Sequence, residues 1–182
     1  MEHRGTRRLE TERLILRRFE MEDAQMMFDN WASDEEVTAY LIWPAHKDVE
    51  VTREVLAEWT GMYEKEDFYQ WAIVPKEFME PIGSISVVRQ NEKAELAHVG
   101  YCISRSWWRR GVTSEALKAV IDFLFDEVGY TCIQSRHDPQ NPNSGKVMQK
   151  CKMKYEGTLR HCDWNNTGIC DASYYSILSD ER

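Results

Sequence analysis

The spacing of apolar residues changes along the chain, and residues 104–125 show the clearest change. The second half of this stretch repeats at the spacing of an amphipathic helix. The segment VGYCIS before it is apolar enough for a buried strand, and a short loop of arginines, tryptophans and one glycine lies between the two. We therefore predict a strand, a basic loop and a helix in succession. The recurring helical positions are Thr113, Ala116, Leu117, Val120, Ile121 and Leu124.

The other elements are predicted in the same way, from apolar residues at helical spacing or in alternation along a strand. Proline, glycine and acidic residues mark their ends. Strands are expected over residues 9–19, 68–74, 82–89, 94–104, 131–136, 155–160 and 169–178. Further helices are expected over residues 23–32, 49–65 and 144–151, with another helix start at residue 33. This order predicts an α+β fold, in which a mixed central β-sheet of about seven strands is flanked by about four helices. We expect one domain over residues 1–182.

Composition and charge exclude several classes of protein. The chain is 42% hydrophobic and 30% charged, which is ordinary for a soluble globular protein. A net charge of −8 argues against nucleic acid or a membrane surface as a partner. No apolar run approaches the roughly 20 residues that a bilayer-spanning helix needs, and the first residues lack the apolar region of a secretory signal.

Cysteine usage indicates the cellular compartment. The number of cysteines is odd, and no two have C-x-x-C spacing, so we expect neither a zinc site nor a disulfide framework. No metal is therefore expected, and a reducing cytoplasm fits this pattern best. The cysteines are Cys102, Cys132, Cys151, Cys162 and Cys170.

The basic loop before the long helix has the chemistry of a phosphate site. The first N–H groups of a helix lack partners within the helix and lie at the positive end of its dipole, which favours an anion. Arg105, Arg109 and Arg110 are a basic exception in an acidic chain. Taken alone, a solvated turn before an ordinary helix would be the simpler explanation of these residues.

Four motifs, in this order, resemble those of the GNAT superfamily of acetyl-CoA-dependent N-acetyltransferases, and most closely its ribosomal-protein N-terminal acetyltransferase branch. They are TERLILR with an acidic helix start behind it, GYCIS-x-x-WWRRGVTSEAL, the NPNS of residues 141–144, and KMKYEGTLR followed by DASYY. The resemblance covers about residues 9–178. It implies a GNAT fold, with a V-shaped splay between strands 4 and 5 that opens a cleft for the thioester.

The resemblance assigns the basic loop to the pyrophosphate of CoA. The family's loop has the form Gln/Arg-x-x-Gly-x-Gly/Ala, which falls here on Trp108, Gly111 and Thr113, and Arg109 stands where this branch usually has glycine. The pantetheine arm is implied to pair with the strand near Ile103. The backbone amides implied to face the pyrophosphate belong to Arg109, Arg110, Gly111, Val112, Thr113 and Ser114.

The short helix after the fifth strand is implied to hold the other end of CoA. Asn141 resembles the residue that hydrogen-bonds the pantetheine arm, and Ser144 resembles the residue near the sulfur in this branch. Many family members carry a tyrosine acid one turn further along, where this chain has Met148, so Ser144 is the substitute candidate. On residue type alone, Asn141 could be only a turn residue and Ser144 only a helix N-cap.

Acetyl transfer needs a neutral amine, and two residues before the loop are candidate bases. His98 lies where this branch often has a carboxylate, and an unperturbed pKa of about 6.5 would leave it largely neutral at pH 7. Glu95 is the second candidate, on the opposite face of the strand if no bulge intervenes. Asp171, on the last strand, could position the amine. Ordinary strand, surface and sheet-edge roles are the alternatives for these three residues.

The resemblance implies direct transfer of acetyl from acetyl-CoA, as co-substrate, to a primary amine. The favoured acceptor is the α-amine of a protein N-terminus. The alternative acceptor is a small-molecule amine, such as an amino acid, a polyamine or an antibiotic. The alternative of another class is a CoA-binding sensor or interaction module with little catalysis. We expect a cytoplasmic monomer or homodimer.

Overall fold

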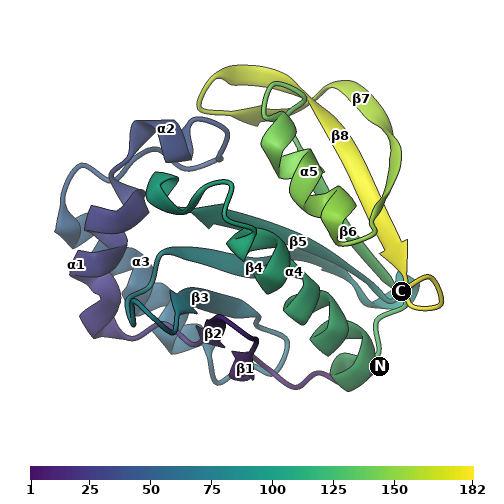
Figure 1. The fold of residues 1–182 in the computed structure, drawn as a ribbon, viewed down its shortest axis with the longest axis horizontal. Helices are drawn as coiled ribbons and strands as arrows, with labels where there is room; N and C mark the ends of the chain where they lie inside the picture. The colour runs from purple at the N-terminus through teal and green to yellow at the C-terminus, as the bar shows by residue number, and fades with distance from the viewer.

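One mixed sheet of eight strands organises the molecule, which the computed structural model describes over residues 1–182 (Figure 1). The strand order is β1-β2-β3-β4-β5-β6-β8-β7, and every neighbouring pair is antiparallel except β5 and β6, which run parallel. The strands are β1 (Leu9–Glu10), β2 (Leu14–Arg17), β3 (Gln70–Pro75), β4 (Gly83–Asn91), β5 (Leu96–Ile103), β6 (Cys132–His137), β7 (Lys154–Asn165) and β8 (Gly168–Leu178).

Helices cover both faces of the sheet, with α4 and α5 on one face and α1 and α3 on the other (Figure 1). The α-helices are α1 (Ala24–Met27), α2 (Glu35–Thr38), α3 (Val49–Met62), α4 (Val112–Phe123) and α5 (Pro142–Lys150). Short 3₁₀ and π turns are η1 (Met21–Asp23), η2 (Phe28–Ala32), η3 (Glu92–Ala94), η4 (Arg105–Trp107) and η5 (Leu124–Val128). No helix combines the length and the apolar character that crossing a bilayer requires.

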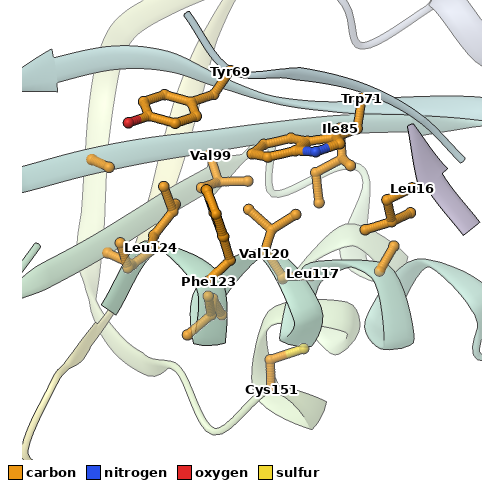
Figure 2. Close-up of a cluster of buried hydrophobic side chains, with 14 of the residues drawn as sticks. Leu16, Tyr69, Trp71, Ile85, Val99, Leu117, Val120, Phe123, Leu124 and Cys151 are labelled. Carbon is orange, nitrogen blue, oxygen red and sulfur yellow. The ribbon is translucent and has the colours of Figure 1, made fainter. Parts of the chain in front are cut away.

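The alternation of side chains along β3 explains why the sheet has a core on each face. Trp71 and Ile73 belong to the larger core with α4, whereas Ala72 and Val74 belong to the smaller core with α1 and α3. Burying each large apolar side chain stabilises the fold by about 1.5–3 kcal/mol. Figure 2 shows the larger core, where the labelled side chains include Leu16, Tyr69, Trp71, Val99, Leu117, Val120 and Phe123.

β5 and β6 pair only at their first residues and then separate. Their register runs from Leu96, opposite Cys132, to His98, opposite Gln134, and ends there. β5 continues unpaired on this side to Ile103, so a V-shaped opening forms between the strands, beside α5 (Figure 1). The predicted splay between strands 4 and 5 is confirmed, since β5 and β6 are those two strands.

The sheet has one strand more than the seven predicted. The segment predicted as one strand turns at Thr11, whose N–H donates to the carbonyl of Leu14 over 3.0 Å. This turn folds β1 back antiparallel to β2. The two-residue β1 is too short to produce its own alternating pattern, so the sequence showed a single strand.

The close approach of β4 to β5 generates a prediction about stability. A Cβ on Gly83 would lie 2.4 Å from the carbonyl oxygen of Cys102 and 2.9 Å from the Cα of Ile103, both backbone atoms of β5. We expect Gly83→Ala to lower the free energy of unfolding by about 2 kcal/mol, because the strands must move apart. Chemical denaturation measures this change.

Gly61 provides the matched control, since a Cβ there would meet no atom within 4 Å. Gly61→Ala in α3 should raise stability by about 0.5–1 kcal/mol, because alanine favours the helix. Wild-type stability of Gly83→Ala would contradict the tight packing of β4 on β5.

Candidate functional site

The backbone of β5 presents polar groups that pair with no strand to the opening between β5 and β6, where the Ile103 carbonyl has a side-chain partner, Trp108 Nε1 at 2.9 Å. Ser104 N–H donates to the Ile82 carbonyl over 2.8 Å, so Ile103 and Gly83 form a pair without mutual hydrogen bonds. The N–H and C=O of Ile103, and those of Tyr101 two residues earlier, therefore point away from β4 toward the opening. An exposed strand edge of this kind binds an extended ligand as an added strand.

The loop that follows β5 contains two residues in the left-handed conformation. Arg109 has φ of 62° and Gly111 has φ of 75°, and α4 begins directly afterwards at Val112. The conformation of Arg109 is the one that the glycine usual in this branch would adopt freely. An arginine there carries a strain of about 1 kcal/mol.

The start of α4 offers free backbone donors. No side chain caps this helix, and its first N–H groups have no acceptor within the helix. Four of the amides that the resemblance assigns to a pyrophosphate, at Gly111, Val112, Thr113 and Ser114, lie here. Their arrangement suits an anion, because the positive end of the helix dipole adds to the free donors.

Two of the motifs, about 100 residues apart in sequence, meet at this loop. Glu115 in the first turn of α4 accepts from Arg13 Nε over 2.7 Å and from Thr11 Oγ1 over 2.5 Å. The guanidinium of Arg13 also donates to the carbonyl of Arg110 over 3.0 Å. Because C=O and N–H point in opposite directions in a trans peptide, this contact turns the Gly111 N–H away from Arg13. Sequence reasoning missed Arg13 and Glu115, since neither motif shows its partner.

The three arginines of the loop have different surroundings. Arg105 is paired with Asp34 over 2.6 Å and with Glu36 over 2.7 Å, so its charge is already balanced by residues around α2. The Arg110 guanidinium stacks over the Trp107 ring at 4.9 Å from its centroid. Arg109 and Arg110 are exposed and remain the cations that could contact a bound phosphate.

Ser144 lies in the first turn of α5, across the opening from β5. The helix begins at Pro142 and Asn141 precedes it, so Ser144 is the third helical residue and not the N-cap considered from the sequence. Its Oγ donates to the Tyr101 hydroxyl over 3.1 Å, and that hydroxyl donates to the Ser144 carbonyl over 2.9 Å. Tyr101 was missed in the sequence, because its partner lies 43 residues away. Met148, one turn further along, is fully buried.

His98 is buried on the opposite face of β5 from Tyr101. It is 4% exposed and lies edge-on to the Tyr174 ring, 6.2 Å between centroids. Burial, with smaller contributions from the charges of Arg136 and Arg89, lowers the pKa of His98 to about 4. The expectation of an unperturbed pKa is therefore wrong, and the imidazole is neutral throughout the physiological pH range.

Glu95 does not lie on β5, contrary to the prediction. It follows η3 with φ of 46°, and β5 begins one residue later at Leu96. Its carbonyl accepts from the N–H groups of Thr131 and Cys132. Glu95 is therefore at the paired end of β5, whereas Tyr101 and Ile103 are at the open end.

Asp171 lies on β8, where its Oδ1 accepts from the His161 N–H over 2.9 Å. Side chains alternate along β8, so Asp171 is on the face of Tyr175, opposite that of Tyr174. Tyr174 is the residue that contacts His98. The structure thus brings Tyr101 and Ser144 together and places His98 and Asp171 on opposite faces of the sheet.

Comparison with known proteins agrees with this geometry. A family model described as an acetyltransferase (GNAT) domain matches residues 13–154. An uncharacterized N-acetyltransferase p20 of Bacillus licheniformis is 30% identical over 173 residues, which is 95% of this chain and 97% of that protein. The ribosomal-protein-serine acetyltransferase of Escherichia coli K12 is 26% identical over 144 residues, 78% of this chain and 79% of that protein.

A solved structure shows the same fold at lower identity. It is a ribosomal L7/L12 α-N-protein acetyltransferase in complex with coenzyme A, and it superimposes with a TM-score of 0.85 at 17% identity. The match covers 97% of this chain and 100% of that one.

The left-handed residue in the loop generates a prediction. The free energy of unfolding of the Arg109→Gly variant should be about 1–2 kcal/mol higher than that of Arg109→Val. A β-branched side chain is strained at this φ, whereas glycine is not. Arg110, whose φ is not left-handed, provides the control, and there the valine variant should be the more stable. Equal denaturation midpoints for the two Arg109 variants would show that the loop relaxes.

Burial of His98 predicts a pH dependence of stability. An imidazole in the unfolded chain titrates near about 6.5, well above the pKa of about 4 in the folded protein. The unfolded state therefore takes up a proton first as the pH falls. The contribution of His98 to stability is complete above about pH 6.5 and declines by up to about 3 kcal/mol toward pH 4.

Denaturation of wild type and His98→Gln at pH 7 and about pH 4.5 measures this decline, which the variant should largely lose. His161→Gln, a change at an exposed histidine, is the control and should leave the decline unaltered. If stability declines as much in His98→Gln as in the wild-type protein, other groups cause the decline.

Proposed function

Since this chain belongs to the GNAT acetyltransferase family, a family of acetyl-CoA-dependent acyltransferases, we propose that it acetylates the α-amine of protein N-termini. The observation that carries the proposal is the unpaired edge of β5 next to the uncapped start of α4. One extended molecule with a phosphate group could pair with this strand edge and bind the helix start at the same time. Acetyl-CoA has this form, with a pantetheine arm joined to a pyrophosphate.

The residues of the opening fit acetyl-CoA. The free N–H groups of Tyr101 and Ile103, and the free C=O of Tyr101, suit the amides of the pantetheine arm. The amides from Arg109 to Ser114 suit the pyrophosphate, with the exposed Arg109 and Arg110 as charged donors. Asn141, whose side chain does not cap α5, is free to donate to the arm. The bound thioester would supply the activated acetyl group.

Two groups on this chain serve the transfer itself. His98 is unprotonated at pH 7, and because its pKa of about 4 makes it a weak base, it suits accepting a hydrogen bond from the attacking amine or from the water molecule that takes up the proton. The Ser144 hydroxyl can donate a hydrogen bond to the departing sulfur. A ligand held along the open edge of β5 would lie between these two groups, which project from opposite sides of the strand. Glu95, at the far end of β5, is the less suitable base.

The acceptor is proposed from the relatives and from the walls of the site. The Escherichia coli relative is named a ribosomal-protein-serine acetyltransferase, which favours a protein N-terminus. The tip of the β7–β8 hairpin contacts the loop after α2, because Asn166 N–H donates to the Leu41 carbonyl over 3.1 Å. Tyr40 on that loop donates to the Gln140 carbonyl over 3.3 Å. These contacts join the loop after α2 to the β7–β8 hairpin and to the segment before α5. Because they narrow the space for an acceptor, they favour a small-molecule amine as the second candidate.

A cytoplasmic location belongs to this proposal, because all five cysteines are unpaired, as in a reducing compartment. GNAT acetyltransferases act on amine acceptors, and turnover distinguishes an enzyme from a CoA-binding sensor. A sensor would bind acetyl-CoA and transfer acetyl to no amine.

Mass spectrometry of peptides and small amines incubated with the protein and isotopically labelled acetyl-CoA tests the acceptor. We expect label on the α-amine of peptides with a free N-terminus, at rates above those for amino acids and polyamines. Label on small amines alone would replace the first acceptor by the second. Tight acetyl-CoA binding without label on any amine would indicate a sensor.

Gly111→Glu is the loss-of-function variant for this experiment, since it adds a negative charge at the start of α4. We expect its affinity for acetyl-CoA to fall by at least about tenfold in calorimetry, through repulsion of the pyrophosphate and loss of the free amides. Gly129→Glu is the matched control, because Gly129 is also left-handed but lies beyond the other end of α4. Unchanged affinity in Gly111→Glu would exclude the loop as the pyrophosphate site.

A further inference from the structure

The Tyr101–Ser144 pair forms the only hydrogen bond between two side chains that joins the open end of β5 to the start of α5. Ser144 Oγ donates to the Tyr101 hydroxyl, and the Tyr101 hydroxyl donates to the carbonyl of Ser144. The serine is therefore held at two points by one phenol. A serine hydroxyl hydrogen otherwise rotates freely to suit its surroundings, so this contact selects the direction in which the hydroxyl points.

Both partners of the pair are fixed from behind. β4 holds β5 along its whole length, through Tyr101 opposite Ile85. α5 is held against α4 by Cys151, whose Sγ donates to the Ser114 carbonyl over 3.2 Å. It is held against β6 at Gly145, where a Cβ would lie 2.5 Å from His137 Nε2. The distance between the phenol and the serine is thus set by the fold and not by the two side chains alone.

We propose that Tyr101 is a positioning residue that aims the Ser144 hydroxyl at the sulfur of CoA, so that a chain of two hydrogen bonds stabilises the departing thiolate. This inference rests on the proposed function of the opening as the acetyl-CoA site. The thiolate is the stronger acceptor, so the Ser144 proton turns to the sulfur. The phenol of Tyr101 then donates to Ser144 Oγ, and each hydrogen bond strengthens the other.

The atoms of the transfer balance without ionisation of either residue. The amine nitrogen forms a bond to the acetyl carbon, the C–S bond breaks, and its electron pair stays on sulfur. The proton that the nitrogen loses passes to a water molecule, which can donate a hydrogen bond to His98, and reaches the thiolate through solvent. Ser144 and Tyr101 keep their own protons throughout.

Tyr101 is suited to donate a hydrogen bond and not to act as the acid. Burial raises the pKa of its phenol above the usual value, whereas a thiol ionises near about 8.5 in water. The phenol therefore holds its proton more tightly than a thiol does. This arrangement provides a tyrosine hydroxyl near the sulfur although α5 has Met148 at the position of the family's tyrosine.

Calorimetry with CoA and acetyl-CoA tests the inference without any acceptor. Between pH 7 and about pH 9.5 free CoA becomes a thiolate, whereas acetyl-CoA has no ionisable sulfur and cancels every other titration. We expect the ratio of the acetyl-CoA Kd to the CoA Kd to rise about tenfold over this range in the wild-type protein. The nearby titratable groups are Cys151, Tyr175 and His137, and they affect both ligands alike.

Tyr101→Phe and Ser144→Ala should each reduce this rise to about twofold or less, and the double variant should reduce it no further. The acetyl-CoA Kd should stay within about twofold of wild type. Tyr155→Phe removes an exposed phenolic hydroxyl on β7 and is the matched control. In this variant the ratio of the two Kd values should rise as much as in the wild-type protein. On a peptide acceptor, Tyr101→Phe should lower kcat about tenfold and leave the KM for acetyl-CoA unchanged.

Three results would overturn the inference. They are a full rise in Tyr101→Phe, an equal loss of affinity for both ligands in that variant, and an additive loss in the double variant. A rise that depends on Tyr101 in a protein that acetylates no peptide would keep the inference and overturn the proposed acceptor.

Discussion

The separation of β5 from β6 after His98 is the constraint on which the rest of the site depends. A strand that loses a neighbour keeps N–H and C=O groups that need partners. Side chains meet part of this need, since Ser135 Oγ donates to the Val99 carbonyl over 2.8 Å and Trp108 Nε1 donates to the Ile103 carbonyl over 2.9 Å. The N–H groups of Tyr101 and Ile103 face the same opening, which makes it a place for a ligand with amides of its own.

The loop at the end of β5 is shaped from a distance. Its two left-handed residues leave the carbonyl of Arg110 pointing at Arg13, which belongs to the turn before β2. Glu115 holds that guanidinium and keeps a carboxylate close to an anion site without leaving its charge unbalanced. The turn before β2 is therefore part of the site, although β2 lies three strands away from β5 in the sheet.

Whereas the splay was implied only by the family resemblance, the order of the elements and the basic loop could be predicted because they leave local patterns in the sequence. Three facts about the site could not. Glu95 leaves the strand through a left-handed φ that its residue type does not announce. His98 contacts Tyr174, which lies 76 residues later on β8, and the burial of His98 in the fold sets its pKa. Tyr101 and Ser144 meet only because the fold crosses the opening.

Binding of acetyl-CoA at the open edge of β5, as proposed, would also link the amount of folded protein to metabolism. A ligand that binds only the folded state stabilises it by mass action, by about 2.7 kcal/mol when its concentration is 100 times the Kd. A strand edge that acetyl-CoA completes would be better protected in well-fed cells and more open to local unfolding when acetyl-CoA is scarce. The abundance of the protein would then follow the supply of its own co-substrate, with no separate regulatory site.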